Sequence, residues 1–378
     1  MKVAIVHEWL VTYAGSERVL EKMLEVYPEA DLYAIVNFLP HSEKTFLKNR
    51  PVNTSFIQKL PLARKKYKTY LPLMPLAVEQ FDLSRYDLII SSSHAVAKGV
   101  LTGPNQLHIC MCYSPVRYAW DLQHQYLFES KLTKGFKSFM ARMLLHYIRL
   151  WDYRTSNSVD QFIAISKFIS QRIKKVYGRN STVIYPPVDT DNFVLHHQKE
   201  DFYLTVSRMV PYKKIDLIAE AFSKMPDKKL IIIGDGSEFN KIKKNSVANI
   251  ELLGYQNNTV IIDYMQRAKA FIFAAEEDFG IVVLEAQACG TPVIAYNKGG
   301  SKETVIDYHL DQENATGVLF NYQNTESLIE AVNYFESISL NILSQNCRDN
   351  ALKFNPERFK KEFNDFMESK IKEFYEQN

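Results

Sequence analysis

The sequence predicts an α/β protein made of two Rossmann-like domains, each with a parallel sheet. The chain has 378 residues, which is too long for one average domain. Short apolar runs, typical of buried parallel strands, alternate along the chain with segments of helical periodicity. About six such runs fall on each side of a break at Pro186-Pro187. Two separate sheets therefore fit the pattern better than one large sheet.

The individual strands follow from these apolar runs. In the first half they are expected at 2–6, 32–36, 86–91, 107–112, 161–165 and 182–185. In the second half they are expected at 202–206, 229–233, 250–253, 270–275, 293–296 and 318–320. The adjacent prolines cannot be helical, and the polar residues up to Glu200 lack a period. We therefore expect domains at 1–190 and 200–354, followed by a charged amphipathic helix over 355–378.

Composition excludes several classes of protein. The chain is 46% hydrophobic and 24% charged, as in ordinary globular proteins. Its four cysteines form neither a disulfide scaffold nor a zinc-ligand pattern, which fits a reducing cytosol. No stretch approaches the roughly 20 apolar residues of a membrane span, and the opening strand has no signal-peptide layout. We expect a cytoplasmic protein that binds peripherally to the inner face of the cell membrane.

Charge is distributed unevenly. Residues 1–200 carry 26 Lys and Arg against 17 Asp and Glu, whereas the remaining residues carry 20 against 26. The first half therefore favours an anionic partner. Nucleic acid is a poorer candidate than a membrane, because no nucleic-acid-binding motif accompanies the charge.

Two basic stretches contain apolar residues as well, at 59–74 and 131–154. Such segments suit an anionic membrane surface. For the second stretch, a core helix with a solvated basic face is an equally good interpretation. Its apolar residues are expected on one side of the helix: Phe136, Phe139, Met140, Met143, Tyr147, Ile148 and Trp151. The residues expected at the surface that meets a membrane or another anionic partner are Arg64, Lys65, Lys66, Lys68, Arg117 and Lys137.

Two glutamates eight positions apart predict a ligand site. Glu277 follows the strand expected at 270–275, and Glu285 lies about one turn into the helix expected at 281–289. Open α/β sheets bind ligands at the carboxyl ends of their strands, and a helix start attracts anions. A carboxylate beside a helix start can hold a hydroxylated group next to a phosphate, as a sugar nucleotide requires. Taken alone, the pair fits two solvated glutamates equally well.

The surrounding residues make the pair more specific. Phe279-Gly280 follows the first glutamate, Glu285 begins the run E-A-x-A-x-G-x-P-V-I-A, and Gly299-Gly300 comes next. This context resembles the E-x7-E region of retaining glycosyltransferases of family 4, which have the two-domain GT-B fold. The resemblance implies that Glu277 binds hydroxyls of the transferred sugar and that Glu285 binds the nucleotide ribose. It also implies that four residues approach the sugar and phosphates through their main chain: Phe279, Gly280, Ile281 and Val282.

Further donor-side residues follow the first strands of the second half. Arg208 and Lys213 match the basic positions of the family segment G-R-L-x-x-x-K-G, and such cations can neutralise a departing diphosphate. Ser207 and Lys214 replace two glycines of that pattern, which makes a less compact loop. Gly234 lies in a turn that approaches the nucleotide in the family, although a plain β-turn is an equally good interpretation.

The first half resembles the acceptor-binding domain of the family. Gly15 precedes a helix at a position where backbone can approach a phosphate. The segment S-S-H-x-x-x-K, which contains His94, is typical of relatives resembling bacterial O-antigen and capsule mannosyltransferases. Tyr113 stands where such relatives have a histidine beside the transferred sugar. Either Tyr113 replaces that histidine as a positioning group, or His94 or His124 takes its role.

The resemblance covers nearly the whole chain and implies a retaining glycosyltransferase with an N-terminal acceptor domain and a C-terminal donor domain. The terminal helix is expected to pack back on the N-terminal domain. The mannosyltransferase-like segments favour GDP-mannose as donor, with a lipid-linked oligosaccharide of surface polysaccharide (O-antigen or capsule) synthesis as acceptor. No metal or other cofactor is expected. Alternatives are a UDP-sugar donor, a sugar-nucleotide epimerase and a non-catalytic nucleotide- or glycan-binding protein. Acceptor, linkage and oligomeric state stay open.

Overall fold

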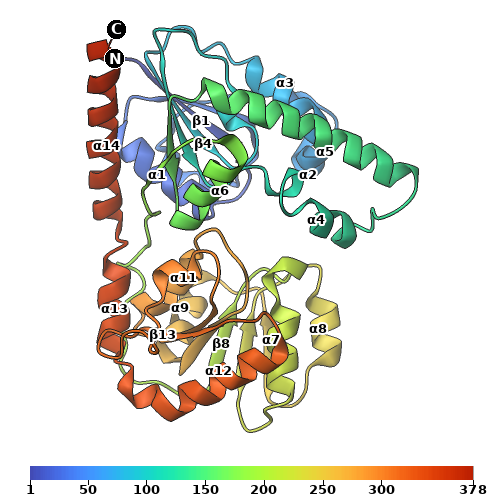
Figure 1. Cartoon of the computed structure of the whole chain (residues 1–378), viewed down its shortest axis with the longest axis vertical. Coiled ribbons are helices and arrows are strands. Elements are labelled where there is room, and N and C mark those ends of the chain that lie inside the picture. The colour runs from blue at the N-terminus through green and yellow to red at the C-terminus, as the bar shows by residue number, and fades with distance from the viewer. Residues whose placement is uncertain (378) are drawn as a thin grey trace. The chain divides into compact units, whose positions relative to one another are not determined.

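The computed structural model describes residues 1–377 and divides into two compact units (Figure 1). The first unit comprises Met1–Tyr185 together with the chain from Phe359 onward, and the second comprises Pro186–Arg358. Each unit contains one sheet in which all neighbouring strands are parallel. The predicted α/β class with two parallel sheets is therefore confirmed.

The first sheet has the strand order β3-β2-β1-β4-β5-β6-β7. Its strands are β1 (Val3–Leu10), β2 (Asp31–Asn37), β3 (Val52–Thr54), β4 (Leu88–Ser93), β5 (Leu107–Cys112), β6 (Gln161–Ala164) and β7 (Thr182–Val183). The α-helices of this unit are α1 (Gly15–Val26), α2 (Ala63–Lys66), α3 (Met74–Glu79), α4 (Gln123–Glu129), α5 (Phe136–Thr155) and α6 (Lys167–Tyr177). Because β1 and β4 are central neighbours, the loops that follow them lie at the same edge of the sheet.

The last helix, α14 (Pro356–Gln377), begins in the second unit and continues in the first. Figure 1 shows α14 beside α1, and contacts join α14 to α1 and to Tyr27, the residue that follows it. The ring of Phe363 meets that of Tyr27 edge-on at 6.4 Å, and Lys360 Nζ lies 3.2 Å from a carboxylate oxygen of Glu25. Phe359 and Phe363 are fully buried, as their spacing on an amphipathic helix requires. Residue 378, the end of the predicted helix, lies outside the described residues.

The second sheet has the strand order β10-β9-β8-β11-β12-β13. Its strands are β8 (Tyr203–Val206), β9 (Leu230–Ile233), β10 (Ile250–Gly254), β11 (Ala270–Phe273), β12 (Val293–Tyr296) and β13 (Gly317–Phe320). Its helices are α7 (Ile215–Ser223), α8 (Phe239–Asn245), α9 (Asn258–Arg267), α10 (Ile281–Ala288), α11 (Ser301–Thr304), α12 (Thr325–Ile338) and α13 (Ser344–Leu352).

Both faces of the second sheet are covered, which explains why its strands are continuously apolar. Leu230 and Ile232 pack into one hydrophobic cluster, whereas Ile231 and Ile233 pack into another. Successive strand residues point to opposite faces, so a strand with helices on both faces has no polar side.

The predicted strands are all present, two of them (107–112 and 293–296) with the predicted bounds. Two expectations need correction. The short strand β3 was not predicted, because its three residues lie at the sheet edge and carry no apolar run. The helix expected over 131–154 begins only at Phe136, after Gly135 in the left-handed region (φ 86°). Across residues 1–377, every helix is too short or too polar to span a lipid bilayer.

Candidate active site

Two of the residues predicted to bind the donor lie together at the carboxyl ends of two adjacent strands of the second unit. Glu277 follows β11, and Lys213 ends a short 3-10 turn (Pro211–Lys213) after β8. The strands are parallel neighbours, and Lys213 Nζ lies 2.5 Å from Glu277 Oε1. Each side chain keeps about one sixth of its surface exposed, 16% for Lys213 and 17% for Glu277. The pair is therefore accessible to a ligand while shielded from bulk water.

The glycines after β12 hold the backbone around Glu277. Gly300 N–H donates to Glu277 O over 2.8 Å, and Gly299 is left-handed (φ 68°). A Cβ at Gly299 would lie 2.2 Å from Glu277 O, and one at Gly300 would lie 2.1 Å from Phe279 O. Only glycine allows the 299–300 loop to pack this closely on the residues next to Glu277.

The start of α10 lies beside this carboxylate. Gly280 caps the helix in the left-handed region (φ 80°), and Ile281 and Val282 form its first turn. The first N–H groups of a helix have no intrahelical partner and attract anions. Glu285 follows one turn later, with 8% of its surface exposed. The segment therefore presents a carboxylate, a helix start and a second carboxylate in sequence.

Arg208 and Gly234 belong to two loops that run side by side. Arg208 is exposed, and its nearest described hydrogen-bond partner is the Tyr212 hydroxyl at 3.5 Å. A Cβ at Gly234 (φ 137°) would lie 1.9 Å from Ser207 O, so close loop packing by itself requires this glycine. Lys214 takes the left-handed conformation (φ 58°) at a position where the family has glycine.

The first unit contains a buried carboxylate that sequence reasoning missed. Glu8 of β1 is fully buried and accepts backbone N–H groups of the loop after β4. The donors are His94 (3.0 Å), Ala95 (2.7 Å), Val96 (2.9 Å) and Ala97 (3.0 Å). Burial alone would raise the pKa of Glu8, but the charge of His94 and these N–H groups outweigh it and lower the pKa. Glu8 therefore shapes the loop that carries His94.

His94 is half-buried, and its ring meets that of Trp9 edge-on at 4.7 Å. Within residues 1–377, no side chain or main-chain group hydrogen-bonds either ring nitrogen of His94. Burial lowers the pKa of His94, an effect that exceeds the opposing attraction of Glu8. The imidazole is therefore neutral near pH 7 and can exchange hydrogen bonds with a ligand.

Tyr113, by contrast, has its hydroxyl inside a chain of hydrogen bonds. The Tyr113 hydroxyl lies 2.9 Å from Ser92 Oγ and donates to Ser16 O over 3.2 Å. Ser92 Oγ lies 2.9 Å from His7 Nδ1, and His7 Nε2 lies 3.3 Å from Glu17 Oε1. Burial raises the pKa of Tyr113 well above its usual range. The phenol therefore secures the start of α1, where Gly15 is the first residue.

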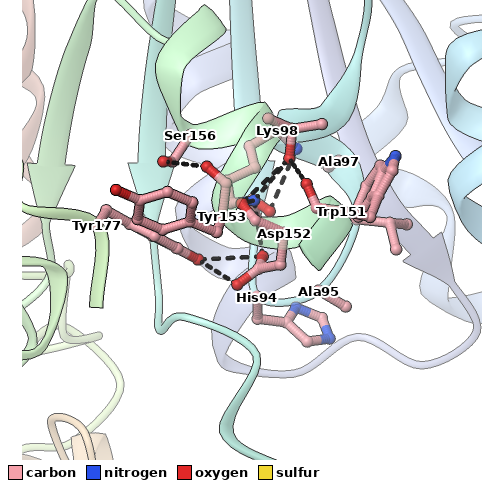
Figure 2. Close-up of polar contacts among 12 residues, drawn as sticks. His94, Ala95, Ala97, Lys98, Trp151, Asp152, Tyr153, Ser156 and Tyr177 are labelled. Atoms are coloured by element: carbon pink, nitrogen blue, oxygen red, sulfur yellow. Dashed lines mark hydrogen bonds and ion pairs between the residues drawn. The ribbon is translucent and has the colours of Figure 1, made fainter. Parts of the chain in front are cut away.

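A buried ion pair lies close to His94 and includes Lys98 of the same loop (Figure 2). Lys98 Nζ lies 2.7 Å from Asp152 Oδ1, with 2% and 0% of the side chains exposed. Trp120 Nε1 donates to Asp152 Oδ2 over 2.7 Å, and the Tyr177 hydroxyl donates to the same oxygen over 2.9 Å. The pair therefore joins the loop after β4 to α5, to α6 and to the segment around Trp120. The only sequence signal for it was two charges placed among apolar residues.

The expected surface residues occupy different elements of the first unit. Arg64, Lys65 and Lys66 are exposed on α2, Lys68 is exposed on the following turn, and Lys137 is exposed on α5. Arg117 is half-buried and repels a charged His94. His124 is exposed on α4. Within residues 1–377, no cluster of three or more His, Cys, Asp or Glu side chains is arranged to hold a metal ion.

The chain matches two family models, described as Glycosyltransferase Family 4 over residues 13–192 and Glycosyl transferases group 1 over residues 189–354. An uncharacterized glycosyltransferase of Methanocaldococcus jannaschii is 32% identical over 186 residues, covering 48% of this chain and 50% of that protein. A Corynebacterium glutamicum protein is 29% identical over 208 residues, covering 47% of this chain and 53% of that protein. Its name is GDP-mannose-dependent monoacylated alpha-(1-6)-phosphatidylinositol monomannoside mannosyltransferase. Each match spans about half of the relative's length.

Solved structures match nearly the whole chain. HepE of Anabaena, solved in complex with UDP, has a TM-score of 0.69 and 18% identity, covering 98% of this chain and 100% of that chain. Sucrose-phosphate synthase of Thermosynechococcus elongatus has a TM-score of 0.71 and 15% identity, covering 98% of this chain and 99% of that chain. This likeness confirms the GT-B fold expected from the sequence.

Proposed function

We propose that this chain, which belongs to glycosyltransferase family 4, transfers mannose from GDP-mannose to a lipid-linked oligosaccharide. The observation that carries the proposal is the Lys213–Glu277 pair beside the start of α10. Within this loop cluster a carboxylate can bind the hydroxyls of a sugar, while a cation and a helix start can bind the diphosphate of a sugar nucleotide. Family membership also argues against the sugar-nucleotide epimerase and the non-catalytic binding module.

Each donor-side residue has a role in this proposal. Glu277 binds hydroxyls of the sugar, and Glu285 binds the ribose. The main chain from Phe279 to Val282 contacts the sugar and diphosphate. Arg208 and Lys213 neutralise the charge that develops on the diphosphate as the sugar leaves, which is the largest single contribution in many enzymes. Gly234 brings backbone close to the nucleotide.

The reaction proceeds with retention and without a metal ion or a covalent nucleophile. The acceptor hydroxyl attacks the sugar on the same face from which the nucleoside diphosphate leaves. Lys213, Arg208 and the N–H groups of α10 supply positive charge where a metal would otherwise be needed. Closure around the substrates excludes water and limits hydrolysis of the donor.

His94 contacts the transferred sugar or the acceptor, and Tyr113 is a positioning residue. Three observations support this division of roles. His94 offers ring nitrogens that no described residue occupies. The Tyr113 hydroxyl already binds Ser92 and Ser16. His124 is exposed on α4, away from the contacts that order the loop of His94. Gly15, at the start of α1, approaches a phosphate.

The choice of donor rests on relatives. Besides the corynebacterial protein, a relative from Mycolicibacterium smegmatis is also named as a GDP-mannose-dependent mannosyltransferase, at 28% identity over 189 residues. A UDP-sugar is the second candidate, because HepE was solved with UDP. With a lipid-linked oligosaccharide as acceptor, the enzyme would act in the synthesis of a surface polysaccharide, either the O-antigen of lipopolysaccharide or a capsule.

A lipid-linked acceptor places the protein at the inner face of the cell membrane. The exposed basic residues Arg64, Lys65, Lys66 and Lys68 form one cationic stretch. Lys137 and Arg117 lie on other elements of the same unit. Each Lys or Arg near an anionic surface contributes roughly 1 kcal/mol of attraction. We propose that this unit binds the acceptor and that the second unit binds the donor.

Thermal stabilisation by nucleotides tests the proposed function. The purified chain would be heated with GDP, UDP, ADP and their mannose, glucose and N-acetylglucosamine conjugates, without added metal. A ligand at 100 times its dissociation constant adds about 2.7 kcal/mol to the free energy of unfolding. Selective stabilisation by GDP and GDP-mannose supports the proposal. Selective stabilisation by UDP compounds overturns the donor, and no response to any nucleotide overturns the function.

A further inference from the structure

Helix α5 has apolar residues on two opposite faces. One face packs into the first unit through Leu145, Ile148 and Trp151, which are buried. The other face is exposed, and its residues recur three or four positions apart: Phe136, Phe139, Met140, Met143, Tyr147 and Leu150. We call these six residues the exposed face of α5. The expectation that all the apolar residues share one side of this helix is therefore wrong.

The orientation of α5 is fixed by its buried face. Asp152 forms the buried ion pair with Lys98 and accepts a hydrogen bond from Trp120. The Asp152 carbonyl oxygen accepts a second bond from Lys98 Nζ over 2.9 Å. Rotating the helix to bury its other face would leave a charge without its partner in the interior, which costs several kcal/mol. The exposed face is therefore a permanent feature of this fold.

This amount of exposed apolar surface is unusual. Phe136 keeps 77% of its surface exposed and Leu150 keeps 60%. Phe128 of the preceding helix α4 is also exposed, at 75%. Single exposed apolar residues are common, but a continuous row of them marks a surface that binds a partner.

The charges around the exposed face indicate which partner it binds. Residues 130–151 contain no Asp or Glu and five basic residues: Lys131, Lys134, Lys137, Arg142 and Arg149. A second copy of this chain would bring these cations against one another in a symmetric dimer. An anionic lipid surface instead offers negative headgroups for the cations and an acyl boundary for the aromatic and aliphatic side chains.

A second apolar and basic segment adjoins α5. Leu62 directly precedes α2 and is exposed, as is Leu76 on α3. The turn Tyr67–Leu73 carries Leu71, which packs against the cluster formed by Leu145 and Ile148. The segment is therefore anchored to the buried face of α5 and belongs to the same part of the first unit.

We infer that the exposed face of α5 inserts into the headgroup region of an anionic bilayer, with the helix lying in the plane of the membrane. This goes beyond electrostatic attraction, because apolar side chains replace water with acyl chains. The inference rests on the proposed function only in that a lipid-linked acceptor gives the enzyme a reason to be at a membrane. Vesicle binding itself requires no catalysis.

Flotation with vesicles tests the inference. Wild-type protein would be mixed with vesicles of phosphatidylcholine and phosphatidylglycerol in equal parts, and separately with phosphatidylcholine alone. We expect binding to the anionic vesicles and at least tenfold weaker binding by the double variant Met143→Glu/Tyr147→Glu. The matched control is Leu310→Glu/Leu340→Glu, which makes the same kind of change at exposed residues of the second unit, and we expect wild-type binding from it.

Three results would overturn the inference. The first is a failure of wild-type protein to bind anionic vesicles. The second is equal binding by wild type and the Met143/Tyr147 variant, since the basic residues would then suffice. The third is a wild-type dimer that the same variant converts to a monomer, which would make a second copy the occupant. Circular dichroism and nucleotide stabilisation verify that each variant is folded. Stabilisation by nucleotides without vesicle binding would contradict this inference alone. Vesicle binding without stabilisation by nucleotides would contradict the proposed function alone.

Discussion

Lys213 Nζ and Glu277 Oε1 lie 2.5 Å apart at the carboxyl ends of β8 and β11. Sequence motifs identified each residue separately, but only the sheet order makes them partners. Because the pair is partly exposed, its own contribution to stability is small. In the proposed function, it holds a cation and a carboxylate where the sugar and diphosphate meet.

Removing either member of this pair tests the donor site. We expect Lys213→Ala and Glu277→Ala each to lower kcat about 100-fold or more. Lys213 neutralises charge on the departing diphosphate, and Glu277 holds the sugar in position for transfer. Transfer from the donor selected by the stabilisation experiment provides the measurement. Lys241→Ala, at an exposed ion pair of α8, is the control and should retain wild-type rates. Near-wild-type transfer by Glu277→Ala would show that the site is misassigned.

His94 and Tyr113 are distinguished by opposite patterns of activity and stability. His94→Ala removes a ring that makes no described hydrogen bond, so we expect kcat to fall about 100-fold with little change in Tm. Tyr113→Phe loses the bonds to Ser92 and Ser16, which costs about 1–2 kcal/mol of stability, while kcat changes only a few-fold. The reverse pattern would give Tyr113 the role at the substrate.

Glu8 makes the free energy of unfolding depend on pH in the acidic range. Its folded pKa lies below the ordinary value of 4.5, so the folded protein favours the carboxylate. This contribution is fully present above pH 4.5 and is lost as the pH falls through the folded pKa. We expect Glu8→Gln to lower the free energy of unfolding by about 3 kcal/mol at pH 7 and to flatten its decline at low pH. Urea unfolding from pH 3 to pH 7 measures both effects, and parallel pH curves for variant and wild type would contradict the assignment.

The Lys98–Asp152 pair predicts strong coupling between two substitutions. Lys98→Met or Asp152→Leu alone leaves one charge buried without its partner, at a cost of about 3–5 kcal/mol. The double variant leaves neither charge, so its destabilisation should be smaller than the sum of the two single effects. Denaturant unfolding of all four proteins completes the cycle. Additive effects would mean that the pair does not act as a unit.

Local sequence features predicted most of the fold. Apolar runs located every strand except β3, whose three edge residues, Val52–Thr54, have no such run. Glycine patterns also marked positions that the structure explains sterically, since Gly299 and Gly300 each touch backbone that a Cβ would overlap. These signals are local. A strand buried on both faces requires a short apolar run, and a left-handed turn requires glycine at a single position.

The sequence by itself determined the α/β class, the two parallel sheets and the segment around Glu277 that identifies the family. Only the tertiary structure decided which side chains are partners: Lys213 with Glu277, Lys98 with Asp152, and Glu8 with the loop of His94. It also decided which apolar face of α5 is buried. The physical reason is that strand and helix periodicity depends on neighbours along the chain. Ion pairing and burial depend instead on sheet order, which brings together residues far apart in sequence.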